Sequence, residues 1–124
     1  MVTYVLRRLQ SGNIALSKIL NFEPIGNIIG RVKNNHGFVY NINVKDSERL
    51  KKHGSEMLNI YETLLKYNYG VDTMKLASWE KITDPFTVTS FYDSNGYQKC
   101  QNTSPIYFDD KVDIFEINQY FKKL

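Results

Sequence analysis

IIGRVKNNHGFVYNINV, residues 28–44, is the stretch of sequence that decides the fold. In its first arm Ile28, Gly30 and Val32 share one face, and Arg31 and Lys33 share the other. The second arm repeats the alternation, and its expected inward positions are Phe38, Tyr40, Ile42 and Val44. Alternation with a period of two is typical of a strand with one buried face. Residues 33–37, which are rich in Asn and Gly, can form the loop, so the stretch predicts a β-hairpin.

Upstream of the hairpin, residues 2–9 read as a strand that ends at a turn cluster, residues 10–13. Residues 14–22 allow two interpretations. Their length favours a short helix, whose apolar stripe would be Leu16, Ile19 and Leu20. The alternative is a strand, because Ile14, Leu16 and Lys18 also alternate.

Downstream, residues 46–48 can open a short helix, and residues 56–67 give the clearest helical pattern of the chain. Ser55 is a suitable N-cap, and Gly70 is a suitable end. One face of this predicted central helix carries Met57, Tyr61, Leu64 and Leu65.

The second half predicts more strands and a final helix. Residues 74–82 are apolar but ambiguous, residues 86–92 read as a strand, and a turn at 93–96 returns the chain along 97–102. Asp84 and Pro85 separate the first two of these segments, and residues 106–108 predict a further short strand. Residues 113–124 predict an amphipathic helix with Ile114, Ile117, Phe121 and Leu124 on one face.

These elements predict one α+β domain over residues 1–124, built on an antiparallel sheet of about five or six strands. A central helix and the C-terminal amphipathic helix would pack on that sheet. The residues that we expect to be largely buried are Phe38, Tyr40, Ile42, Val44, Met57, Tyr61, Leu64, Ile114, Ile117 and Phe121.

The cysteine count and the start of the chain bear on the compartment. Cys100 is the only cysteine, so the chain cannot form an internal disulfide, and a reducing compartment is expected. The sequence begins without a basic leader and long apolar run, and its apolar stretches are short. We therefore expect a cytoplasmic protein that does not enter a membrane.

The motifs of metal, cofactor and nucleophile chemistry are missing from the sequence. His36 and His53 lie far apart, the chain lacks HExxH, CxxC and DxDxDG patterns, and Asp109, Asp110 and Asp113 are expected at a helix N-terminus. The sequence also lacks GxxxxGK[ST], GxGxxG and GxSxG. We therefore expect no catalytic residues, no metal ligands and no cofactor.

The binding surface is expected on the polar face of the hairpin and just after it. Residues 1–54 carry nine bases and three acids, and the rest of the chain carries seven bases and ten acids. Such a split can attract an acidic partner. The candidate binding residues are Arg31, Lys33, Asn41, Asn43, Lys45, Arg49, Lys51 and Lys52, with Tyr67, Tyr69, Trp79 and Tyr97 as exposed aromatic candidates.

From these features the sequence favours a non-enzymatic factor that binds another protein: an inhibitor, immunity or adaptor protein. Lys, Asn, Ile and Tyr number 12, 12, 11 and 9, a bias of AT-rich coding that suggests a phage or mobile element. The first alternative is a small nucleic-acid-binding protein that uses the basic hairpin face. The second is a metal-free ribonuclease, with His36 or His53 as acid or base.

Overall fold

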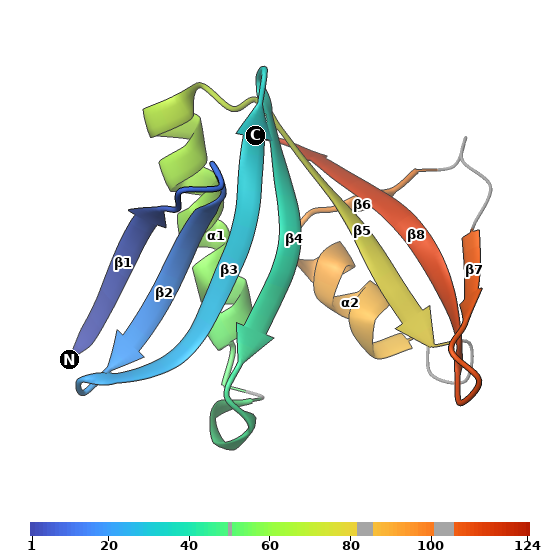
Figure 1. Cartoon of the computed structure of the whole chain (residues 1–124). Helices are drawn as coiled ribbons and strands as arrows, with labels where there is room; N and C mark the ends of the chain where they lie inside the picture. Colours follow the sequence, from blue (N-terminus) through green and yellow to red (C-terminus); the bar gives the residue numbers. More distant parts are fainter. Residues whose placement is uncertain (50, 82–85, 101–105) are drawn as a thin grey trace.

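The computed structural model describes residues 1–49, 51–81, 86–100 and 106–124. They form an eight-stranded sheet in the order β1-β2-β3-β4-β5-β8-β6, with β7 also paired to β8. Two helices, α1 (His53–Tyr69) and α2 (Phe86–Ser94), lie behind the sheet (Figure 1). The strands are β1 (Val2–Arg8), β2 (Ile14–Leu20), β3 (Glu23–Lys33), β4 (His36–Val44), β5 (Thr73–Lys81), β6 (Gln98–Lys99), β7 (Ile106–Asp109) and β8 (Ile114–Lys123).

The first four strands form an antiparallel meander, as the alternating sequence predicts for residues 2–9 and 28–44. Residues 14–20 are a strand, so the helical interpretation of this segment is wrong and its alternative is confirmed. Ile14 and Leu16 point into the core, and Lys18 follows them inward with 1% of its surface exposed. The Lys18 ammonium is paired with Glu56 of α1, which is why a lysine fits at an inward position.

The hairpin of β3 and β4 is confirmed, but a β-bulge changes which residues of β4 face inward. Ile29 is opposite Asn41 while Gly30 is opposite Val39, so Tyr40 is the extra residue of β4. The bulge turns Val39 into the core and leaves Tyr40 58% exposed. The prediction that Phe38 and Tyr40 share the buried face is therefore wrong, because a bulge shifts the alternation by one residue. Ile42 and Val44, beyond the bulge, are half-buried and pack against the core.

The central helix is confirmed and runs as α1 over the inner face of β2, β3 and β4. Met57, Tyr61 and Leu65 are fully buried, and Leu64 is half-buried. The hydroxyl of Tyr61 donates a hydrogen bond of 2.9 Å to the carbonyl of Ile14. A side chain at Gly30 would collide with this hydroxyl, so the glycine allows α1 to approach the sheet closely.

After α1 the chain returns as β5, which runs parallel to β4. The pairing covers four residues of each strand and ends at Val39 and Leu76. Beyond this point the two strands diverge, and the sheet opens between them (Figure 1). The predicted sheet class is thus wrong in part: the domain is α+β, but the sheet is mixed and has eight strands.

The segment 86–92, predicted as a strand, is part of helix α2. Its end is the predicted turn, in which Gly96 has a φ of 85° and the Tyr97 amide donates to the carbonyl of Tyr92. Within the described residues the returning strand is short, and only Gln98 and Lys99 pair with β8. Asp84, Pro85 and Asn102 lie outside the described residues. The strand predicted at 106–108 is confirmed as β7.

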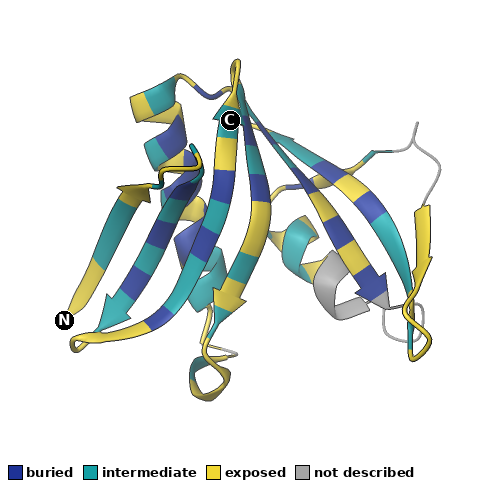
Figure 2. Ribbon diagram, in the orientation of Figure 1, coloured by how far each residue is buried: buried dark blue, intermediate teal, exposed yellow. Residues whose placement is uncertain are grey.

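The chain ends in strand β8, so the predicted C-terminal helix is wrong. Asn118 and Tyr120 face inward and are buried, whereas Ile114 is 48% exposed and Ile117 and Phe121 are half-buried (Figure 2). Asp109 and Asp110 serve a tight β7–β8 turn, where their side chains accept hydrogen bonds from backbone amides of residues 111–113. They do not precede a helix, as the sequence suggested.

Candidate functional site

A cavity of about 500 Å³ opens beside the C-terminal end of β4. Its walls come from three places: the end of β4, the segment that leads into α1, and helix α2. The lining residues that bear functional groups are Asn43, Glu48, Arg49, Lys52, His53, Ser55 and Tyr92. The cavity thus joins a helix N-terminus, several charged groups and a tyrosine at the end of an interior strand.

The N-terminus of α1 faces this cavity. Lys52 occupies the N-cap position with a φ of 64°, and its side chain makes no capping hydrogen bond. The first amides of an α-helix have no intrahelical partners, and here the N-cap side chain does not satisfy those of His53, Gly54 and Ser55. A positive φ at a non-glycine residue costs about 1–2 kcal/mol. Such local strain is typical of functional loops.

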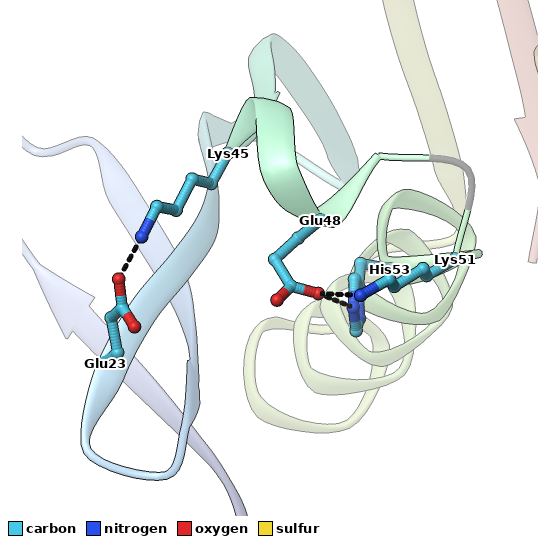
Figure 3. Close-up of polar contacts among 5 residues, drawn as sticks. All are labelled: Glu23, Lys45, Glu48, Lys51 and His53. Carbon is cyan, nitrogen blue, oxygen red and sulfur yellow. Dashed lines mark hydrogen bonds and ion pairs between the residues drawn. The ribbon is translucent and has the colours of Figure 1, made fainter.

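Most of the cations near the cavity are paired with carboxylates (Figure 3). Glu48 accepts from Lys51 at 3.1 Å and lies 3.4 Å from Nε2 of His53. The Lys51 contact, with a smaller contribution from His53, lowers the pKa of the Glu48 carboxyl. Similar pairs join Lys45 with Glu23, and Arg49 with Asp46 at 3.1 Å. Within the described residues, Lys52 has no ion-pair partner, so its charge is available to a ligand.

One ring nitrogen of His53 has no hydrogen-bond partner among the described residues. Its side chain is 12% exposed, and Nδ1 is buried without a hydrogen-bond partner among the described residues. Buried polar atoms are nearly always paired in folded proteins. An unpaired nitrogen beside the cavity is therefore consistent with a polar ligand there.

Tyr92 forms the wall that α2 contributes. Burial raises the pKa of its hydroxyl, a hydrogen bond with Ser78 offsets part of the rise, and the charge of Glu80 adds to it. The Tyr92 ring packs against Tyr97 and Tyr120 at centroid distances of 6.0 and 5.2 Å. This hydroxyl keeps its proton at physiological pH and can act as a proton donor.

Glu80 of β5 is the buried carboxylate next to this tyrosine. It is 3% exposed and accepts hydrogen bonds from the Tyr120 hydroxyl and, at 2.9 Å, from the Asn118 amide. These two donors satisfy both oxygens of the buried Glu80 side chain. A buried carboxylate beside a proton-bearing tyrosine has the composition of an acid–base pair.

The sequence-predicted binding residues do not gather at this cavity as a group. Asn43, Arg49 and Lys52 line it. Lys45 and Lys51 are exposed nearby and are engaged in ion pairs. The remaining three residues lie on exposed parts of the hairpin, outside the cavity: Arg31, whose side chain donates to the carbonyl of Ser11, Lys33 and Asn41.

The four aromatic candidates also lie in different parts of the structure. Tyr67 is 78% exposed near the end of α1, and Tyr69 is half-buried beside the core. Trp79 is 53% exposed on the face of the sheet that α1 does not cover. Tyr97 is 2% exposed, so the expectation that it lies at the surface is wrong; its hydroxyl donates to Glu62 at 2.7 Å.

Sequence reasoning missed Tyr92 and Glu80, and it missed the role of the α1 N-terminus. The residues 86–92 pattern suggested a strand, which hid the position of Tyr92 on a helix. One available signal was the basic run Arg49, Lys51 and Lys52 between a strand and a helix, an arrangement that favours anion binding. The histidines were considered for ribonuclease chemistry, and only His53 lies at the cavity.

Comparison of the sequence with protein-family models and with curated proteins gives no match. Solved structures do match the fold. A GNAT family acetyltransferase from Elizabethkingia anophelis with acetyl-CoA bound gives a TM-score of 0.77 at 12% identity, over 99% of this chain and 98% of that one. A Bacillus subtilis acetyltransferase in complex with CoA gives a TM-score of 0.75 at 14% identity, over 100% and 99% of the two chains.

A third match is a proposed streptothricin acetyltransferase from Bacillus anthracis in complex with acetyl coenzyme A, with a TM-score of 0.72 at 14% identity. The match covers 91% of this chain and 63% of that one, so this chain spans less than two thirds of that protein. These likenesses overturn the interpretation as a non-enzymatic inhibitor, immunity or adaptor protein, together with its two alternatives. The described residues adopt a GNAT-like fold, the fold of acyl-CoA N-acetyltransferases.

Proposed function

We propose that the protein is an N-acyltransferase that binds acyl-CoA between β4 and β5 and transfers the acyl group to an amine. The observation that carries the proposal is the composition of the cavity: an uncapped helix N-terminus on one wall and Tyr92 on another. The acetyl-CoA and CoA bound by proteins of the same fold support it. This proposal, in which acyl-CoA is the acyl donor, replaces the expectation that the protein uses no cofactor.

The first turn of α1 suits the phosphates of CoA. Anions bind at helix N-termini because free amide groups and the helix dipole both favour negative charge. Lys52 adds a cation that forms no ion pair with a carboxylate of the described residues, and Arg49 lies on the same wall. We expect the diphosphate to accept hydrogen bonds from the first-turn amides of α1 and to lie near the Lys52 ammonium.

The diverging strands suit the extended pantetheine arm. The β4–β5 pairing ends at Val39 and Leu76, so the inner edges of residues 41–44 and 77–81 are not joined to each other. An extended chain that carries amide groups can pair with such an edge as an added strand would. This arrangement would direct the thioester along β4 toward Glu80 and Tyr92.

The chemistry needs one proton acceptor and one proton donor. The amine nitrogen attacks the thioester carbonyl, the new C–N bond forms, and the C–S bond breaks to release CoA. The amine must lose a proton, and we assign its acceptance to the Glu80 carboxylate. The leaving thiolate must gain a proton, and we assign its donation to the Tyr92 hydroxyl, which burial keeps protonated.

The direct test is titration of the protein with CoA by isothermal calorimetry. Replacing Lys52 by Glu should weaken CoA binding by roughly tenfold or more, because it reverses a charge at the helix N-terminus. Lys66→Glu is the matched control, since Lys66 is exposed in the last turn of the same helix. Absence of binding by the folded wild-type protein, or equal losses in the two variants, would contradict the proposal.

A further inference from the structure

The face of the sheet opposite α1 carries an uncovered aromatic cluster. Trp79 of β5 lies 5.2 Å from Phe108 of β7 and 6.0 Å from Phe115 of β8, measured between ring centroids. Trp79 is 53% exposed and Phe108 is 46% exposed. Tyr40 stands across the gap on β4, where the bulge turns it outward. Exposed aromatic groups that converge in this way are typical of a binding site.

A groove of about 330 Å³ lies between the two strands on this face. The side chains that define it are Phe38, Tyr40, Lys75, Ala77, Trp79 and Gln119. Its volume suits a small molecule. The groove is therefore a candidate site for the second substrate of an acyltransferase.

The charge of the groove restricts its ligand. No carboxylate of the described residues lines it, and Lys75 is its one charged side chain. Lys75 forms no ion pair within the described part of the chain. An unpaired cation beside aromatic rings favours a ligand that combines a ring with an anionic group.

The groove and the cavity proposed for acyl-CoA both lie along β4. The cavity is lined by residues 42–44 of β4 and by the helices, and the groove by residues 38–40 of β4 and 75–79 of β5. Helix α1 packs on the inner face of the sheet, whereas Tyr40 and Trp79 of the groove are exposed, so an acceptor can reach the groove from solvent.

We propose that this groove binds the acceptor, and that the acceptor is a small aromatic amine bearing a carboxylate, with its ring between Tyr40 and Trp79 and its carboxylate on Lys75. This proposal rests on the proposed acyltransferase function. It assigns acceptor specificity to residues that sequence reasoning assigned to no enzymatic role.

The test uses product analogues and needs neither CoA nor turnover. Trp79 is the only tryptophan of the chain, so its fluorescence reports occupancy of the groove. The probes are N-acetyl-L-phenylalanine, N-acetylphenethylamine, which lacks the carboxylate, and N-acetyl-L-alanine, which lacks the ring. We expect N-acetyl-L-phenylalanine to bind most tightly. Lys75→Met should weaken it roughly fivefold, the strength of one exposed charge pair, without affecting N-acetylphenethylamine.

Two matched variants complete the design. Tyr40→Ala should weaken both aromatic probes, whereas Tyr67→Ala, which removes an exposed tyrosine of α1, should not. Lys33→Met removes an exposed lysine outside the groove and should leave all affinities unchanged. Equal affinities for the three probes, or insensitivity to Lys75→Met, would overturn the proposal. These results would leave CoA binding untouched, so failure of the acceptor site and failure of the acyltransferase function can be told apart.

Discussion

Tyr97, in the segment after α2, donates a hydrogen bond of 2.7 Å to the Glu62 carboxylate of α1. The same carboxylate accepts from Lys122 of β8 at 2.8 Å, so one buried acid connects α1 to both parts of the C-terminal half. Burial, followed by the charge and hydrogen bond of Glu62, raises the pKa of the Tyr97 hydroxyl. Burial also raises the pKa of Tyr61.

These tyrosines predict alkaline unfolding. A phenol whose folded pKa lies above its ordinary value of about 10 stabilises the protein fully below that pH. Above it the unfolded chain releases protons that the folded protein retains, so the free energy of unfolding should fall as pH rises further. Urea unfolding at pH 8, 10 and 11 measures this. Tyr61→Phe should reduce the slope, and Tyr67→Phe, at an exposed position, should not.

The Lys18–Glu56 pair predicts an asymmetric mutant cycle. The Lys18 side chain is 2% exposed and the Glu56 side chain is 54% exposed. Loss of the partner should therefore cost more stability when the buried lysine remains than when the exposed glutamate remains. Glu56→Gln should destabilise the protein by about 1–3 kcal/mol, because it removes the carboxylate partner of a buried lysine. Lys18→Met should cost less, and the double variant should be more stable than Glu56→Gln alone. Urea unfolding of the four proteins measures the cycle; additive effects would contradict the pairing.

The sequence could predict β1, the hairpin and α1 from their residue patterns, but it favoured a helix where β2 lies. It failed at β8, where the inward positions carry Asn118 and Tyr120 and the apolar residues face outward or lie half-buried. These polar groups are buried because Glu80 accepts from both of them. That partner is 38 residues away in sequence from Asn118, so no local pattern could indicate it. The prediction that Tyr40 is buried was wrong for a similar reason, since the bulge depends on pairing with β3.

The candidate site was mostly beyond sequence reasoning, because it depends on where two parallel strands separate. Only the basic run before α1 was visible, and it suggested a charged surface. Ion pairs with Glu23, Asp46 and Glu48 neutralise most of that surface in the folded protein. What remains is the unpaired Lys52 at a helix N-terminus, a feature that needs the backbone conformation to be recognised.

Lys52 predicts a trade-off between stability and binding. Its φ of 64° favours glycine, so Lys52→Gly should stabilise the protein by about 1 kcal/mol while it weakens CoA binding. Asn34→Gly is the matched control, because Asn34 has a φ of 57° in the hairpin turn, away from the cavity. The control should not change the affinity for CoA. Thermal unfolding and calorimetric titration measure the two effects, and a Lys52→Gly variant with unchanged affinity would remove this lysine from the site.

The role proposed for Tyr92 predicts that removal of its hydroxyl lowers kcat and not the affinity for acetyl-CoA. Tyr92→Phe keeps the ring packing against Tyr97 and Tyr120 and removes only the hydroxyl, so the fold should persist. Loss of a general acid lowers kcat by about 100-fold or more, and the KM for acetyl-CoA should change little. The pKa of the Tyr92 hydroxyl is raised, so wild-type kcat should not decline on protonation grounds until the pH exceeds about 10. Tyr69→Phe, on the far end of α1, serves as the control and should retain full activity. Thiol release from acetyl-CoA in the presence of L-phenylalanine measures these rates, and a Tyr92→Phe variant with normal kcat would assign protonation of the thiolate to another group.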